Sequence, residues 1–138
     1  MRYVIYARKS SESEERQILS IESQISELKE FAAKEKLEIV ASFQEAQTAK
    51  EPGRTKFAEM LSFLQAGKAD GILSWHPDRL ARNSIDGGQI IYLLDTGKIK
   101  DLKFPTHWFE NTPQGKFMLN IAFGQSKYYV DNLQILCG

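Results

Sequence analysis

Segments with the composition of β-strands alternate with segments of helical period along this chain. The strand-type segments are RYVIYA (2–7), LEIVASF (37–43), DGILSW (70–75) and KDLKFP (100–105). Regular alternation of strand and helix is typical of α/β proteins with a parallel sheet. The sequence therefore predicts one α/β domain with a mainly parallel, four- to five-stranded sheet flanked by helices.

The helical segments carry their own start and stop signals. A helix beginning near Ser20 has one apolar stripe, formed by Ile21, Ile25, Leu28 and Ala32. A second helix has Phe57, Met60, Leu61 and Leu64 on one face, and a third runs through 89–95. Gly67 and Gly97 are placed to end the second and third helices. Thr112 can cap the last helix and Pro113 suits its first position, so we expect a helix from there to about residue 135.

The last helix is apolar around nearly its whole circumference. One stripe contains Met118, Ala122, Tyr129 and Leu133, and a neighbouring stripe contains Phe117, Ile121 and Tyr128. A helix of this kind needs cover on every side, from its own domain or from a second subunit. In a domain of 138 residues we favour the second subunit. The helix at about 113–135 is thus predicted to mediate oligomerisation.

Composition excludes several classes of protein. The chain has 18 Lys and Arg against 18 Asp and Glu, and no apolar run near the roughly 18 to 20 residues that span a bilayer. Its start, MRYVIYARKS, lacks the features of a signal peptide. Cys137 is the single cysteine, which excludes an internal disulfide and suits a reducing compartment. We expect a cytoplasmic protein with no membrane partner.

The sequence offers no pattern for a cofactor. His76 and His107 are isolated in the sequence, and no Cys/His spacing typical of a metal site is present. No P-loop motif of the form GxxxxGKS or GxxxxGKT occurs. We therefore expect no metal, no nucleotide and no other cofactor.

Charged and hydroxyl side chains follow two of the predicted strands. Arg8 and Ser10 follow the first strand, and Asp78, Arg79 and Arg82 follow the third. Ligands of open α/β sheets bind at the carboxyl ends of the strands. Arg79 and Arg82 are spaced as if one helical turn apart, where like charges repel. An anion between them would remove this conflict.

Arg54, at the start of the second helix, shows a similar conflict, because a cation there opposes the helix dipole. A phosphate at this helix N-terminus would resolve it. Guanidinium groups bind phosphate well, so Arg8, Arg54, Arg79 and Arg82 could converge on one phosphate. With Ser10 beside them, the set indicates phosphoryl transfer to the serine hydroxyl, which positive charge would activate.

Each of these residues also has a structural interpretation. Any single arginine could be a solvated surface residue, and Ser10 lies in a serine-rich loop. Asp78 could be only a helix N-cap, and Gln24 could be part of the polar rim of the first helix. Trp75 and Trp108 fit packing roles better than base stacking.

Four motifs in order resemble the serine recombinases, the family of resolvases, invertases and large serine integrases. These motifs are YARKS, SIESQ, PGR and DRLAR, and the likeness extends from the first strand to TPQGK at the last helix. The segment WHPDRLARN and the pair Gly87–Gly88 resemble the large serine recombinases more closely than the small resolvases. The resemblance implies a resolvase-like catalytic domain that acts in site-specific recombination or integration of mobile DNA.

The resemblance also implies a mechanism. The nucleophile would be Ser10, forming a 5′-phosphoserine link to DNA within a tetramer, and the freed 3′-hydroxyl would later reverse the attack. Asp78 would orient arginines and Gln24 would place the phosphate or the serine. The residues implied around the scissile phosphate are Arg8, Arg54, Arg79 and Arg82. Glu45 stands where many members have an acidic residue.

The family also sets expectations for domains and partners. Members carry a separate DNA-binding region after the long helix, which we expect to be absent from residues 1–138. The neutral charge balance agrees with that expectation. The partners would be DNA and further copies of the chain, at the nucleoid when DNA is bound. Two other functions stay open: a catalytically silent, truncated dimerisation module of the family, and a small serine-dependent phosphotransferase.

Overall fold

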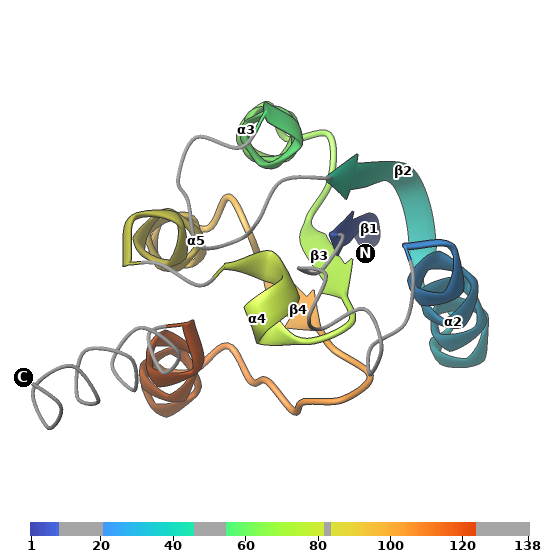
Figure 1. Ribbon diagram of the computed structural model, residues 1–138. Coiled ribbons are helices and arrows are strands. Elements are labelled where there is room, and N and C mark those ends of the chain that lie inside the picture. Colours follow the sequence, from blue (N-terminus) through green and yellow to red (C-terminus); the bar gives the residue numbers. More distant parts are fainter. Residues whose placement is uncertain (9–20, 46–54, 82–83, 124–138) are drawn as a thin grey trace, which may run out of the picture.

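A four-stranded parallel sheet forms the centre of the molecule (Figure 1). The computed structural model describes residues 1–8, 21–45, 55–81 and 84–123. The strands are β1 (Arg2–Arg8), β2 (Glu38–Glu45), β3 (Gly71–Ser74) and β4 (Asp101–Lys103), in the order β2-β1-β3-β4. The predicted α/β fold is confirmed, with four strands in the described part of the chain.

Helices connect and cover these strands. They are α2 (Ile21–Glu35), α3 (Thr55–Gln65), α4 (Pro77–Leu80) and α5 (Ser84–Asp95), followed by a further helix at 113–123. Gly67 and Gly97 have φ of 78° and 80° just after α3 and α5, as the sequence predicts, because glycine adopts this left-handed conformation without steric cost. No helix among these residues has the length and apolar character needed to cross a membrane.

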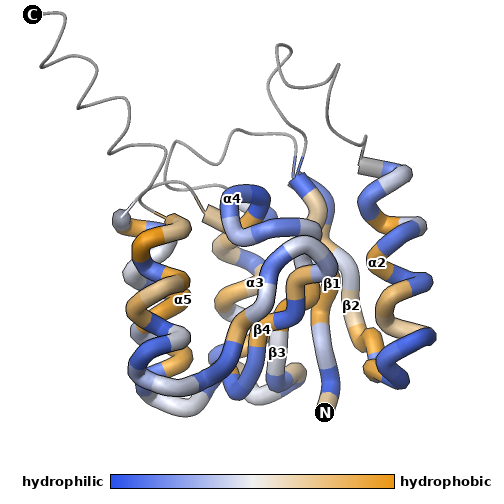
Figure 2. Tube along the Cα trace, turned by 90° about the horizontal axis from the view of Figure 1, so that it is seen from below, coloured by the Kyte–Doolittle hydropathy of each residue, from blue (hydrophilic) through white to orange (hydrophobic). Residues whose placement is uncertain are grey.

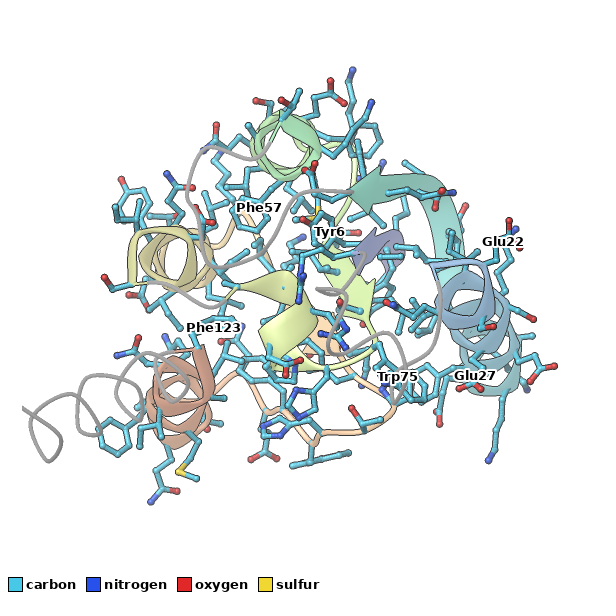
Figure 3. The ribbon with its side chains drawn as sticks, viewed as in Figure 1. Tyr6, Glu22, Glu27, Phe57, Trp75 and Phe123 are labelled. Carbon is cyan, nitrogen blue, oxygen red and sulfur yellow. The ribbon has the colours of Figure 1, made fainter. Side chains whose placement is uncertain are left out.

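Alternate residues of β1 face different helices, as the two-residue period of a strand requires. Val4 and Tyr6 belong to the larger core, with α3, α5 and helix 113–123, whereas Ile5 packs with Leu28 of α2 on the other face. Figures 1 and 3 show α2 alone on one side of the sheet. The ring of Tyr6 meets that of Phe57 edge to face, with centroids 5.8 Å apart (Figure 3). The apolar face predicted for α3 thus packs in the larger core, and the apolar face predicted for α2 packs in the smaller core on the other side of the sheet.

Helix 113–123 begins as the sequence predicts. The Gly115 amide donates to the Thr112 hydroxyl at 3.0 Å, and Pro113 is the first helical residue. A Cβ on Gly115 would lie 1.8 Å from the carbonyl oxygen of Glu110, so only glycine allows this approach. The stretch 124–135 of the predicted helix lies outside the described residues.

Only one face of helix 113–123 packs on its own domain. Leu119 and Phe123 are buried in the larger core, while Phe117, Met118 and Ile121 are 65%, 57% and 46% exposed. The described domain therefore leaves an apolar side of this helix in contact with solvent.

An ionic network joins the strands at the edge of the sheet where they begin. The Arg2 amide donates to Asp70 at 3.0 Å, and the carboxylate also forms ion pairs with the side chains of Arg2 and Lys100, both at 3.6 Å. Beside it, the Tyr3 hydroxyl donates to Asp101 at 2.6 Å. The hydrogen bond from the Arg2 amide, helped by the positive charges of Lys100 and Arg2, lowers the pKa of Asp70 below its ordinary value of 3.8.

This network makes stability depend on acidity. Because the folded state has the lower pKa, Asp70 stabilises the protein fully above the unfolded pKa, and the effect is lost as pH falls through the folded pKa. We expect Asp70→Asn to lower the free energy of unfolding by on the order of 1 kcal/mol at pH 7. The free energies of unfolding of the two proteins should converge as the pH falls below the folded-state pKa of Asp70. Urea unfolding at several pH values measures this, and an equal difference at pH 7 and at low pH would contradict it.

Candidate functional site

Three elements meet where β1 and β3 end. The Gln24 amide on α2 donates from Nε2 to the carbonyl oxygen of Arg8, the last residue of β1, at 3.2 Å. Arg8 Nη2 in turn donates to the carbonyl oxygen of Asp78 on α4 at 3.4 Å. Figure 2 shows α4 and these strand ends at one end of the molecule, with the N-terminus at the other. The strand-end position predicted for the site therefore holds for these residues.

The polar side chains at this end are deeply buried. Arg8 and Arg79 are each 1% exposed, and Gln24 is fully buried. A guanidinium stays charged at all accessible pH values, so these arginines bring permanent positive charge to a place of low dielectric. Interpreting Gln24 as part of the polar rim is wrong, because the turn of α2 that bears it faces the end of β1 and its amide bonds there. Such an arrangement suits an anion with several oxygens.

The turn after β3 differs from the prediction. His76, not Asp78, is the N-cap residue of α4, and its Nδ1 lies 3.3 Å from the Asp78 amide nitrogen. Pro77 fits the first helical position, which moves the cap back to His76 and makes the N-cap interpretation of Asp78 wrong. The prediction that one helical turn joins Arg79 to Arg82 is also wrong. The helix ends at Leu80, and Ala81 is extended with φ −155° and ψ 146°.

A second segment, which contains Thr106 and His107, packs against this turn. The rings of His76 and His107 pack edge to face with centroids 5.8 Å apart, and the Thr106 hydroxyl donates to the carbonyl oxygen of Trp75. Burial, and then the nearby charge of His76, lowers the pKa of His107. The two histidines that are isolated in the sequence are therefore neighbours.

Trp108 is 80% exposed, so the prediction that it packs in the core is wrong within the described domain.

Glu45 has a structural role that the sequence did not predict. It is 4% exposed at the end of β2, and its Oε2 accepts the amides of Lys56 and Phe57 at 2.8 and 3.2 Å. These amides belong to the first turn of α3, where the sequence suggested a bound phosphate. A carboxylate of the chain itself occupies these two donors. The available signal was an acidic residue at the end of a strand and shortly before a helix.

We expect Glu45→Ala to lower the free energy of unfolding by about 1–2 kcal/mol, because two amides in the first turn of α3, one of them buried, would lose their acceptor. Glu45→Gln keeps an acceptor oxygen of the same reach and should restore most of the loss. Urea denaturation of the three proteins measures the difference. Equal free energies of unfolding for the alanine variant and the unaltered protein would show that the Glu45 cap does not stabilise the fold.

Four of the seven predicted site residues are described, and they lie together. These are Arg8, Gln24, Asp78 and Arg79. Ser10, Arg54 and Arg82 lie outside the described residues. Among the residues that the structure describes, no group of three or more His, Cys, Asp or Glu side chains is arranged to hold a metal ion. The described part offers positive charge and hydrogen-bond donors, which are the groups that stabilise charge on phosphoryl oxygens.

A family model for "Resolvase, N terminal domain" matches residues 3–134 of the chain. A comparison with curated protein sequences found no match. Apart from Arg2, the first residue of β1, the matched range includes every helix and strand described above.

Several solved structures share the fold. The N-terminal catalytic domain of TP901-1 integrase has a TM-score of 0.70 and 20% identity, covering 97% of this chain and 99% of that chain. A resolvase family site-specific recombinase from Streptococcus pneumoniae has a TM-score of 0.62 and 21% identity, covering 99% and 93%. The catalytic domain of ISC1926 TnpA, an IS607-like serine recombinase, has a TM-score of 0.65 and 20% identity, covering 88% and 78%. At these identities the likeness establishes a common fold.

Proposed function

Because this chain belongs to the resolvase family of serine recombinases, we propose that it is the catalytic domain of a site-specific DNA recombinase. Its reaction is cleavage and rejoining of DNA through a 5′-phosphoserine intermediate. The observation that carries the proposal is the burial of Arg8 and Arg79 near the ends of β1 and β3, together with the buried Gln24, which bonds to the Arg8 carbonyl oxygen.

In the proposed reaction the Ser10 oxygen attacks a DNA phosphorus atom. The serine–phosphorus bond forms as the Ser10 hydroxyl loses its proton, and the bond from phosphorus to the 3′ oxygen breaks. The 3′ oxygen takes up one proton and leaves as a hydroxyl, so the step is balanced. Rejoining is the same exchange in reverse, with a 3′-hydroxyl attacking and Ser10 leaving. The phosphoester energy is kept in the covalent intermediate, so the reaction needs no nucleotide.

The arginines have the main electrostatic role in this proposal. Arg8 and Arg79, with Arg54 and Arg82 by their match to the family motifs, surround the phosphate and stabilise charge that grows on its oxygens. Guanidinium suits this task because it hydrogen-bonds two oxygens at once. Asp78 orients arginine side chains. Gln24 fixes the end of β1 through the Arg8 carbonyl, which supports its role in placing the phosphate or the serine.

Assembly and DNA affinity complete the proposal. The exposed side chains of Phe117, Met118 and Ile121 support helix 113–123 as a contact between copies of the chain in a dimer or tetramer. The balance of 18 basic against 18 acidic residues gives the domain little electrostatic attraction to DNA. We expect a separate DNA-binding region to supply sequence recognition.

The test is to fuse the chain to a heterologous DNA-binding domain and supply paired half-sites. We expect a covalent protein–DNA adduct on denaturing gels, and none with Ser10→Ala as the matched control. Absence of any adduct from the unaltered fusion would contradict the proposal and favour a silent dimerisation module. Turnover of a small phosphate ester by the chain alone would instead indicate a phosphotransferase.

A further inference from the structure

The ring of His76 lies where β3 turns into α4, and one of its nitrogens has two competing neighbours. His76 Nδ1 is 3.1 Å from Asp78 Oδ1 and 3.3 Å from the Asp78 amide nitrogen. An ionised carboxylate offers only lone pairs, so the shorter contact is attractive only when Nδ1 carries a proton. A hydrogen bond to a charged acceptor is also stronger than one from a neutral amide. The geometry therefore favours a proton on Nδ1 and a lone pair on Nε2.

The neighbours of this ring hold it in place. The His107 ring packs against it edge to face at 5.8 Å, and Phe104 in turn packs against His107 at 6.1 Å. Burial, and then the charge of His76, lowers the pKa of His107, which favours a neutral His107 ring. The His76 side chain nevertheless remains 40% exposed. Its orientation thus depends on these ring contacts and on Asp78.

His76 is also bonded to the residues that form the site. Its carbonyl oxygen accepts the Arg79 amide at 2.9 Å, while the Asp78 carbonyl accepts Arg8 Nη2 at 3.4 Å. A helix of four residues has little stability of its own, so its geometry depends on such contacts. The ring and the main chain of His76 together fix the start of the helix that carries Arg79 into the buried site.

We propose that His76 is a positioning residue: its Nδ1–H holds the Asp78 carboxylate and so fixes the orientation of α4 and Arg79 at the phosphate. This inference rests on the proposed function for its effect on catalysis. The contact between the His76 ring and the Asp78 carboxylate does not depend on that function and can be measured on the chain alone. The two parts are tested by separate measurements.

The first measurement locates the proton on the ring. Long-range ¹H–¹⁵N spectra of the ¹⁵N-histidine-labelled chain at about pH 8.5, where an ordinary imidazole is neutral, distinguish the two tautomers. We expect the proton of His76 on Nδ1, and on Nε2 in Asp78→Ala, because the Asp78 amide then needs Nδ1 as an acceptor. A proton on Nε2 in the unaltered chain would overturn the proposal.

The second measurement separates capping from positioning. Asparagine is a strong N-cap, so His76→Asn should keep the melting temperature of the unaltered chain. In the DNA-binding fusion it should slow adduct formation on the order of 10- to 100-fold, because Arg79 is no longer held in place. His107→Phe keeps the ring packing and serves as the matched control, with an unchanged rate.

The outcomes are distinguishable. An unchanged adduct rate in His76→Asn would reduce His76 to a cap and overturn the positioning role. Failure of the unaltered fusion to form any adduct would refute the proposed function and the catalytic role of His76 with it. The spectra of the isolated chain would still decide the contact between His76 and Asp78.

Discussion

Arg79→Ala is expected to slow adduct formation on the order of 10²- to 10³-fold in the DNA-binding fusion, because one guanidinium at the transition-state phosphate is lost. Arg79 is 1% exposed on α4. Rates of adduct formation on half-site DNA under single-turnover conditions measure the effect. An adduct rate near that of the unaltered protein would remove Arg79 from the site.

Two controls make this result specific. Arg79→Lys keeps the charge but loses the planar fork that bonds two oxygens, so we expect a rate between those of the alanine and unaltered proteins. Lys98→Ala removes a positive charge from an exposed residue before β4, at the other end of the sheet, and should leave the rate unchanged. Equal losses in Arg79→Ala and Lys98→Ala would mean that only net charge matters. Urea unfolding of each variant excludes loss of the fold as the cause.

Phe123→Ala is expected to lower the free energy of unfolding by about 3–5 kcal/mol, because it removes a fully packed ring from the larger core. Phe123 is 1% exposed and lies on helix 113–123 against α5 (Figure 3). Gln114→Ala, at an exposed position of the same helix, should change stability by less than about 0.5 kcal/mol. Chemical denaturation measures both. A loss below about 1 kcal/mol for Phe123→Ala would mean that the helix does not depend on this contact.

The same contact can be tested from the other side. A Cβ on Gly87 of α5 would lie 2.9 Å from Cδ2 of Phe123, so Gly87→Ala should cost about 1–3 kcal/mol by overpacking. In a Phe123→Leu background the added methyl has more room, and the cost should shrink. Costs that simply add would show that the two residues do not share one packing site.

The predictable part of the fold was the part set by local periodicity. The stripes at Phe57, Met60, Leu61 and Leu64 and the stop signals at Gly67 and Gly97 depend on residues within a few positions of each other, so pattern alone found them. The approach of Arg8 to Asp78 also followed, because the carboxyl ends of adjacent parallel strands meet at one edge.

The unpredicted part depends on contacts between distant segments. Glu45 caps α3 across a gap of 11 residues, and His76 meets His107 only because β3 and β4 are neighbours. Gln24 gave no signal of its burial, since a polar residue beside an apolar stripe is usually exposed. The end of α4 at Leu80 reflects the extended backbone of Ala81, which helical spacing of arginines cannot reveal.

The salt-bridged residues Arg2, Asp70 and Lys100 lie at or just before the starts of β1, β3 and β4, whereas the buried arginines Arg8 and Arg79 lie at the end of β1 and after the end of β3. Substitutions can therefore change the thermal stability of this domain independently of its proposed catalysis. Substitutions intended to change stability alone should alter the charges around Arg2, Asp70 and Lys100 and leave the end with Arg8 and Arg79 unchanged.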